Sequence, residues 1–197
     1  CDDLQTVQLS YLDEQVLISR NDDVGVVGFD VRAPTTLDTA LRERLAATGA
    51  VSVDERVLEI LRVEAGRPLF PVDLDERTIP LEAGIEDRAI SLTKGCYVGQ
   101  EVIIRILHRG QGKVARKLVG LTVMEAASTV PIRNAKLFDN EKEVGHITSA
   151  VQSPALGCPI ALGYVHRDYA APGMQVQIQD QSHGQTGTVT KLPFITP

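Results

Sequence analysis

The sequence has no tryptophan, and aromatic residues make up only 4% of its 197 residues. A stacking platform for nucleic-acid bases is therefore not expected, because such a surface needs several aromatic side chains. The net charge of -6 also argues against direct, general nucleic-acid binding, which needs a largely basic surface. No run approaches the roughly 18 consecutive apolar residues of a membrane-spanning helix, so we expect no membrane partner.

Cysteine is scarce as well, since the chain has only Cys1, Cys96 and Cys158. An odd count without a CxxC pair or a secretory leader favours a reducing compartment, so we expect a cytoplasmic protein. The four histidines lie far apart and at no metal-ligand spacing from a cysteine, so no metal site is expected. The chain opens with CDDLQTV rather than Met, and we expect it to start inside a longer protein whose upstream part is missing.

The first part of the chain combines strand and helix patterns. Residues 15–20 and 24–33 are rich in strand-forming residues and are separated by the turn signal NDD, which predicts a hairpin. Apolar residues at helical spacing then predict a helix over 35–48, with Thr35 or Thr36 as its N-cap.

A second helix is predicted from Asp54 to Ala65, because Asp54 can cap its start and Gly66 can end it. Residues 67–91 are rich in Pro, Asp and Glu without a clear period, and they predict a long ordered loop. Strands followed by helices indicate a lobe of an α+β fold.

The second part of the chain contains short strand patterns at regular spacing, separated by Gly, Pro, Asn or Asp. Six such strands predict a small, closed or nearly closed antiparallel barrel. We place the domain boundary near Gly112, which gives an incomplete α+β domain over 1–112 and a barrel domain over 113–197. The predicted strands cover residues 115–124, 134–139, 142–150, 159–165, 174–180 and 185–191.

Glu64 is a carboxylate at the edge of an apolar helix face, which is formed by Val57, Leu61 and Ala65 at helical spacing. Burying an unpaired charge is unfavourable, so this carboxylate needs a donor. Two interpretations remain open. The partner is either a neighbouring arginine or a ligand that presents a pair of N–H groups.

The stretch KGCYVGQE, residues 94–101, places Cys96 two residues after Lys94 and between two glycines. A single cysteine most often fills a core. A nearby cation, however, favours the thiolate, which is the reactive form of cysteine. The stretch therefore allows either an inert core residue or a reactive thiol that faces a ligand.

Basic residues gather between Arg105 and Lys117 in an otherwise acidic chain. The simplest interpretation is a solvated strand or loop face. The alternative is a patch for an anion, either a polyglutamate tail or an RNA backbone. The residues predicted to form this anion patch are Arg105, Arg109 and Lys113.

KGCYVGQE resembles the signature of the YgfZ-type folate-binding proteins, a branch of the glycine-cleavage T-protein superfamily. RNDDVGVVGFDV (20–31) is similar to the glycine-rich strand segment of that superfamily. LRVEAGRPLFPVDLDERTIPLEAG (61–84) resembles the T-protein run with E-A-G, D-x-D and P-x-E. The tail, from EVGHITSAVQSPALG to VTKLPF, looks like the T-protein C-terminal barrel.

The resemblance implies ferredoxin-like α+β lobes in a three-lobed ring with tetrahydrofolate at its centre, followed by the barrel. The first lobe, which supplies an aspartate for methylene transfer in T-proteins, would lie upstream of Cys1. The resemblance further implies that Lys94 and Cys96 are the catalytic residues. The folate-binding residues that it implies are Glu64, Gly95, Tyr97 and Gln100.

Three functions follow from the resemblance. The first is a tetrahydrofolate-binding accessory protein of the YgfZ type, whose partners are iron–sulfur enzymes, including tRNA-modifying ones. The second is an aminomethyltransferase that takes a C1 unit from a lipoyl carrier protein. The third is a non-catalytic folate-fold domain. KGCYVGQE favours the first over the second, and the presence of Glu64 argues against the third.

Overall fold

A computed structural model describes residues 5–108, 110, 112–123, 129–179 and 184–196. The chain forms two compact units, of which the first ends at Arg62 and the second runs from Val63 to Thr196. The domain boundary near Gly112 stays a prediction, and that position lies inside the second unit, just ahead of the barrel. No helix in the described ranges is both long and apolar enough to cross a bilayer.

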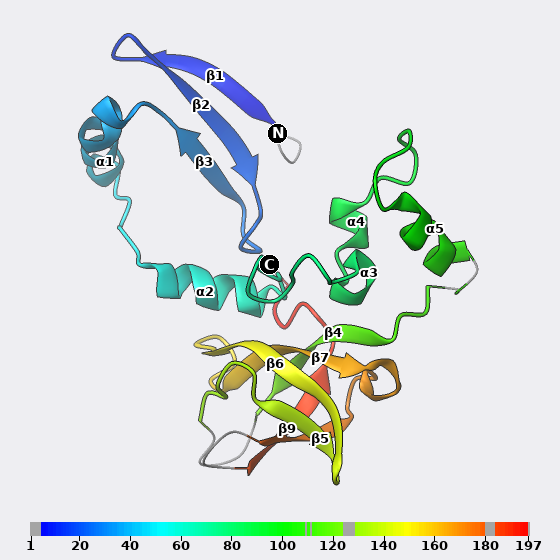
Figure 1. Cartoon of the computed structure of the whole chain (residues 1–197). Coiled ribbons are helices and arrows are strands. Elements are labelled where there is room, and N and C mark those ends of the chain that lie inside the picture. The colour runs from blue at the N-terminus through cyan, green and yellow to red at the C-terminus, as the bar shows by residue number, and fades with distance from the viewer. Residues whose placement is uncertain (1–4, 109, 111, 124–128, 180–183, 197) are drawn as a thin grey trace. The chain divides into compact units, whose positions relative to one another are not determined.

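The first unit contains a three-stranded antiparallel sheet, drawn in blue in Figure 1. Its strands are β1 (Thr6–Tyr11), β2 (Glu14–Asn21) and β3 (Gly28–Arg32), in the order β1-β2-β3. The pairing of β2 with β3 confirms the predicted hairpin. Strand β1 was not predicted, because its turn to β2 uses Leu12 and Asp13 at positive φ, without a glycine to mark it.

Two helices follow this sheet, and the boundary between the two units falls within the second of them, after Arg62. Helix α1 (Asp38–Ala47) follows a short 3-10 turn over Thr35–Leu37, and neither start has a side-chain cap, so the predicted threonine N-cap is wrong. Helix α2 (Glu55–Glu64) begins as predicted, because the carboxylate of Asp54 accepts hydrogen bonds from the backbone N–H groups of Arg56 and Val57 at 3.0 and 3.3 Å.

The segment between α2 and the barrel has more helix than the sequence predicted. The expected loop over 67–91 contains the short helices α3 (Pro80–Ala83) and α4 (Glu86–Ala89). Helix α5 (Gln100–His108) was not predicted either, since its VIIRIL run is typical of a strand. In the structure Ile103 of α5 packs instead with Leu81 and Val114, which is a tertiary contact that strand propensity does not report.

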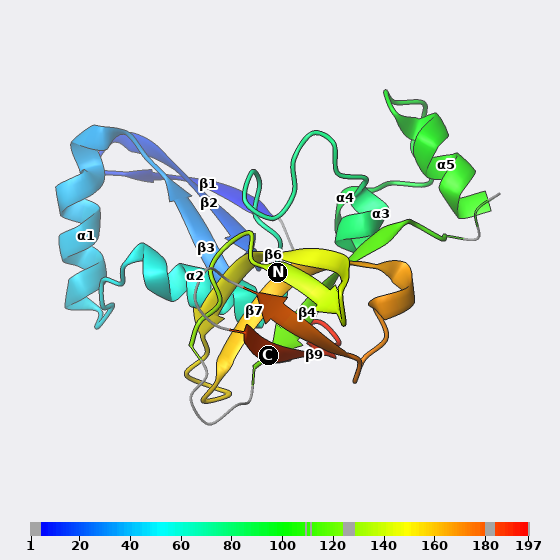
Figure 2. The same ribbon diagram turned by 60° about the horizontal axis from the view of Figure 1, so that its bottom comes forward.

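Six antiparallel strands form a closed barrel with the order β4-β7-β6-β5-β8-β9 (Figures 1 and 2). The predicted α+β fold with a C-terminal six-stranded barrel is thus confirmed. Alternate residues of these strands fill the interior with Val, Leu, Ile and Ala side chains. The strands are β4 (Arg116–Thr122), β5 (Lys136–Asp139), β6 (Lys142–Gln152), β7 (Pro159–His166), β8 (Gln175–Gln179) and β9 (Gly184–Thr190).

Strand β6 carries a bulge that matters for the site. Its register against β7 shifts between Ile147 and Ser149, which leaves Thr148 without a ladder partner. Close by, Gly163 of β7 lies so near to β6 that a Cβ there would sit 2.7 Å from the backbone oxygen of His146. The bulge and the glycine together bring polar side chains of β6 to the outside of the barrel.

Candidate functional site

The carboxylate of Glu64, the last residue of α2, is held by the barrel. Glu64 is 8% exposed, and its Oε1 accepts a hydrogen bond of 2.5 Å from the hydroxyl of Ser153. Ser153 is fully buried just after β6, and its hydroxyl oxygen also accepts a hydrogen bond from the backbone N–H of Leu156. The observed partner is thus a serine hydroxyl, and the arginine partner allowed by the sequence stays a prediction. The Ser153 hydroxyl engages only Oε1 of this carboxylate.

The backbone of Glu64 is held by the segment that follows β9. The N–H groups of Phe194 and Ile195 donate to the carbonyl oxygen of Glu64 at 3.0 and 3.2 Å. Phe194 itself packs over Gly120 of β4, where a Cβ would lie 2.7 Å from the phenylalanine ring. Both the side chain and the backbone of Glu64 are therefore fixed by groups that are distant in the sequence.

The KGCYVGQE loop is exposed except at two residues. Lys94, Gly95 and Cys96 are exposed, whereas Tyr97 and Gln100 are half-buried. The Lys94 ammonium lies 4.9 Å from the centroid of the Tyr97 ring, which is a cation–π contact. The structure therefore brings together Lys94 and Tyr97 from the predicted set.

Tyr97 and Gln100 together shape the turn into α5. The backbone N–H of Tyr97 donates to the side-chain oxygen of Gln100 at 3.3 Å, and Gly99 between them has a φ of +87°. The Tyr97 ring packs against the cluster of Leu81, Ile103 and Val114. Its hydroxyl is buried and has no hydrogen-bond partner among the described residues, so it remains able to donate to a ligand.

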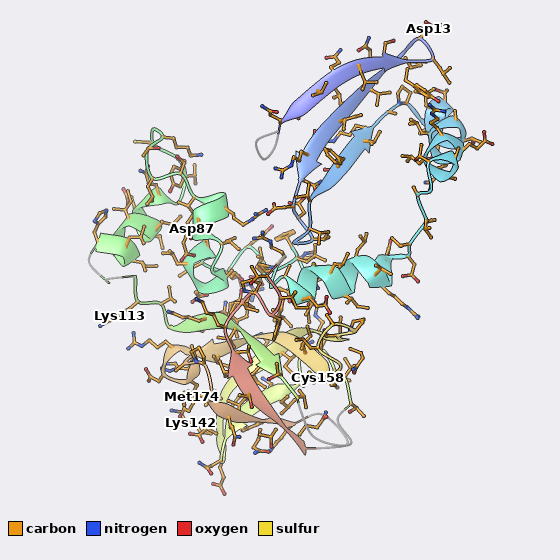
Figure 3. The ribbon with its side chains drawn as sticks, turned by 180° about the vertical axis from the view of Figure 1, so that it is seen from behind. Asp13, Asp87, Lys113, Lys142, Cys158 and Met174 are labelled. Atoms are coloured by element: carbon orange, nitrogen blue, oxygen red, sulfur yellow. The ribbon has the colours of Figure 1, made fainter. Side chains whose placement is uncertain are left out.

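Cys96 is expected to react with a maleimide several-fold faster than Cys158, because Cys96 is exposed and Cys158 is half-buried. Cys158, labelled in Figure 3, lies on the barrel just before β7 and serves as the internal control. Cys1 lies outside the described residues and is first replaced by serine. Peptide mass spectrometry of the natively labelled protein measures both rates. Modification of Cys96 only after unfolding would return this thiol to the core-filling interpretation.

The predicted anion patch is divided between a helix and a loop. Arg105 is exposed in the last turn of α5, and Lys113 is exposed in the segment that leads into β4, where Figure 3 labels it. Arg109 lies outside the described residues. Arg116, a further member of the basic run, is already paired with Glu82, since its Nε donates to Glu82 Oε2 at 2.9 Å.

The segment after α2 is docked on the barrel by two acids to which the sequence assigned no role. Asp73 of the D-x-D motif is 3% exposed, and its Oδ1 accepts hydrogen bonds from the hydroxyls of Thr148 and Ser149 at 2.5 and 2.7 Å. Glu82 of the P-x-E motif is 7% exposed and forms the ion pair with Arg116. Both acids belong to the motifs found in the sequence. Their partners on the barrel could not be predicted, because no pattern near either acid indicates them.

Known proteins are similar to this chain both in the barrel and over most of its length. A family model described as the glycine cleavage T-protein C-terminal barrel domain matches residues 116–195, which run from the start of β4 through the segment that holds Glu64. A crystal structure of the glycine cleavage system aminomethyltransferase T from Bartonella henselae covers 92% of this chain with a TM-score of 0.80 and 28% identity. The chain belongs to the glycine-cleavage T-protein superfamily.

Sequence relatives within this superfamily carry the same name. The aminomethyltransferase of Halothermothrix orenii is 32% identical over 92% of this chain, and that of Thermosynechococcus vestitus is 30% identical over 94%. The chain spans about half the length of these relatives, with 50% and 49% of them covered, and also 50% of the Bartonella structure. The superfamily that the sequence motifs suggested is thereby confirmed. The KGCYVGQE loop lies outside the matched barrel residues.

Proposed function

We propose that the chain is part of a tetrahydrofolate-binding protein of the YgfZ type. The observation that carries this proposal is the state of Glu64. Its carboxylate is buried, and Ser153 holds one of its two oxygens, Oε1. A fixed carboxylate of this kind suits the paired N–H groups at the edge of a pterin, because such charge-assisted hydrogen bonds are about twice as strong as neutral ones.

The KGCYVGQE sequence is the reason for preferring the accessory role over aminomethyl transfer. Cys96 and Lys94 are the residues through which the accessory protein would act, and both are exposed. Tyr97 has a buried hydroxyl without a partner among the described residues, which suits a folate contact together with Gly95 and Gln100. The partners proposed for this role are iron–sulfur enzymes, including tRNA-modifying ones, in the cytoplasm.

A second candidate is supported by the relatives, which are named aminomethyltransferase and match more than nine tenths of this chain. In that case the protein would take an aminomethyl group from a lipoyl carrier protein, release ammonia and leave the methylene group on tetrahydrofolate. In both cases the exposed Arg105 and Lys113 would contact the anionic tail of a polyglutamylated folate.

One experiment on the full-length protein tests both candidates. Tetrahydrofolate is titrated in, and the protein is then supplied with tetrahydrofolate and an aminomethylated lipoyl carrier protein. We expect saturable binding of tetrahydrofolate without release of ammonia or formation of methylenetetrahydrofolate. Formation of both products would replace the accessory role by aminomethyl transfer, and a lack of tetrahydrofolate binding would contradict both candidates.

A further inference from the structure

A small polar pocket of about 150 Å³ opens beside the barrel, within the second unit and apart from Glu64 and the KGCYVGQE loop. One wall is the segment 71–78 that Asp73 docks on the barrel, and the other wall is the outer side of β4, β6 and β7. Since a water molecule occupies about 30 Å³ of liquid, the pocket has room for about five waters or one small organic acid.

Two arginines line this pocket, and most of their donors are unused among the described residues. A guanidinium has five N–H donors. Arg116 uses its Nε for Glu82 at 2.9 Å, and Arg133 uses one Nη2 hydrogen for the backbone oxygen of Val72 at 2.9 Å. Each side chain is anchored by one hydrogen bond, Arg133 from an exposed position, and each retains donors for a ligand.

Tyr164 of β7 contributes a third donor. It is 3% exposed, it lines the pocket, and its buried hydroxyl has no hydrogen-bond partner among the described residues. The ring is held between Arg116, 4.7 Å from its centroid, and the ring of His146, at 6.0 Å. A buried hydroxyl without a hydrogen-bond partner lowers the stability of the fold. Its position at the wall of a pocket indicates that a bound ligand accepts a hydrogen bond from it.

The Tyr164 hydroxyl keeps its proton at neutral pH. Burial is the main cause that raises the pKa of Tyr164 to about 12, and Asp73 and Glu82 act in the same direction. Arg116 and Thr78 act in the opposite direction, with smaller effect than burial. The Thr78 hydroxyl, which donates to Asp75 at 3.0 Å, is close enough to lower the pKa of Tyr164, but the two hydroxyls do not meet the geometry of a hydrogen bond.

The acids of the pocket are already engaged, and they limit how much negative charge it can accept. Asp73 accepts from Thr148 and Ser149, and Asp75 accepts from Thr78 and from the backbone N–H of Arg77. His146 remains neutral more readily than an exposed histidine, because burial, then Arg116 and Lys136, lower its pKa. Two arginines and a neutral hydroxyl beside two acids suit a singly charged, planar anion better than a doubly charged phosphate.

We propose that this pocket binds a small molecule through one carboxylate group, which accepts hydrogen bonds from Arg116, Arg133 and the Tyr164 hydroxyl. The planar group can pair with a guanidinium through two parallel hydrogen bonds. If each heavy atom takes about the 30 Å³ of a water molecule, the three atoms of the carboxylate leave room for about two carbon atoms. The site contains neither Glu64 nor Cys96, so it is independent of the function proposed above.

The test is a titration of the full-length protein with sodium acetate, followed through the backbone amide NMR signals of Thr148 and Tyr164. Sodium chloride at equal ionic strength and neutral acetamide serve as control solutes. We expect saturable shifts with acetate alone. Equal shifts with chloride would mean a general salt effect and would overturn the proposal.

Tyr164→Phe separates binding from folding. Phenylalanine fills the same space and removes only the hydroxyl, so the melting temperature is expected not to fall, because no hydrogen bond is lost. Acetate affinity is expected to drop about tenfold or more, because a hydrogen bond to a charged group is lost. Tyr169→Phe, on the same barrel beside Lys142, is the matched control and should bind acetate as the unmodified protein does. Unchanged affinity in Tyr164→Phe would contradict the proposal.

The glutamyl tail of a folate carries the same chemical group as a free small acid. Repeating the acetate titration with saturating tetrahydrofolate distinguishes the two sources. Displacement of acetate would assign the pocket to the folate tail, whereas simultaneous binding would assign it to a separate small carboxylate. Loss of tetrahydrofolate binding with retained acetate binding would contradict the proposed function alone.

Discussion

Glu64→Gln is expected to weaken tetrahydrofolate binding by about tenfold to a hundredfold, with little change in stability. Glutamine keeps the shape of glutamate, and its Oε1 can still accept the hydrogen bond from Ser153. The amide nitrogen then takes the place of Oε2, so that a donor faces the N–H groups of the pterin. Loss of a hydrogen bond to a charged group lowers affinity by about 1.5–3 kcal/mol.

Equilibrium titration with tetrahydrofolate measures this effect, and thermal unfolding followed by circular dichroism checks the fold. Glu143→Gln is the matched control, because Glu143 is an exposed glutamate of β6 that pairs with Lys136 at 2.6 Å. It undergoes the same chemical change away from Glu64 and should leave the affinity unchanged. If Glu64→Gln bound tetrahydrofolate as tightly as the control, Glu64 would have no role as a pterin anchor.

Asp73→Ala is expected to lower the free energy of unfolding by at least about 1.5 kcal/mol. The change removes the acceptor of the Thr148 and Ser149 hydroxyls and of the Leu69 backbone N–H, at 2.5, 2.7 and 2.9 Å. A hydrogen bond to a charged group contributes about 1.5–3 kcal/mol, and the Thr148 hydroxyl can still donate to the backbone oxygen of Leu162 at 3.2 Å when Asp73 is absent. The segment 67–79 should also separate from the bulge of β6, since Asp73 bonds directly to that bulge.

Urea unfolding followed by circular dichroism measures the loss, since the chain has no tryptophan to report by fluorescence. Asp87→Ala is the control, because Asp87 is an exposed aspartate of α4, labelled in Figure 3. A surface substitution of this kind usually stays within about 0.5 kcal/mol. An equal, small loss for both variants would mean that the Asp73 hydrogen bonds do not dock the segment.

The elements that could be predicted are those whose signals are local. The barrel followed from short alternating strands with turn residues between them, and all six strands formed close to their predicted positions. Helix α2 followed from the Asp54 cap and from Gly66, which adopts a φ of +65° just after the helix. Alternation, caps and turns act within a few residues, so they can be read without knowing the fold.

Helix α5 and the partner of Glu64 show where local patterns fail. The VIIRIL run of α5 has strand propensity, but packing against Leu81 and Val114 outweighs it. Glu64 was correctly located as an acid that needs a donor, yet its donor is Ser153, which lies beyond β6. No spacing along the chain connects these two residues.

The amino-acid pattern alone therefore established the α+β architecture, the barrel, the superfamily motifs and the polar character of the candidate site. The partners of each acid depended on folding: Ser153 for Glu64, the β6 bulge for Asp73 and Arg116 for Glu82. The pocket around Tyr164 likewise exists only once segment 71–78 lies against the barrel. The physical reason is that hydrogen bonds and ion pairs form between groups about 3 Å apart in space, whatever their separation along the chain. Partners that are distant in the sequence therefore become known only from the folded structure.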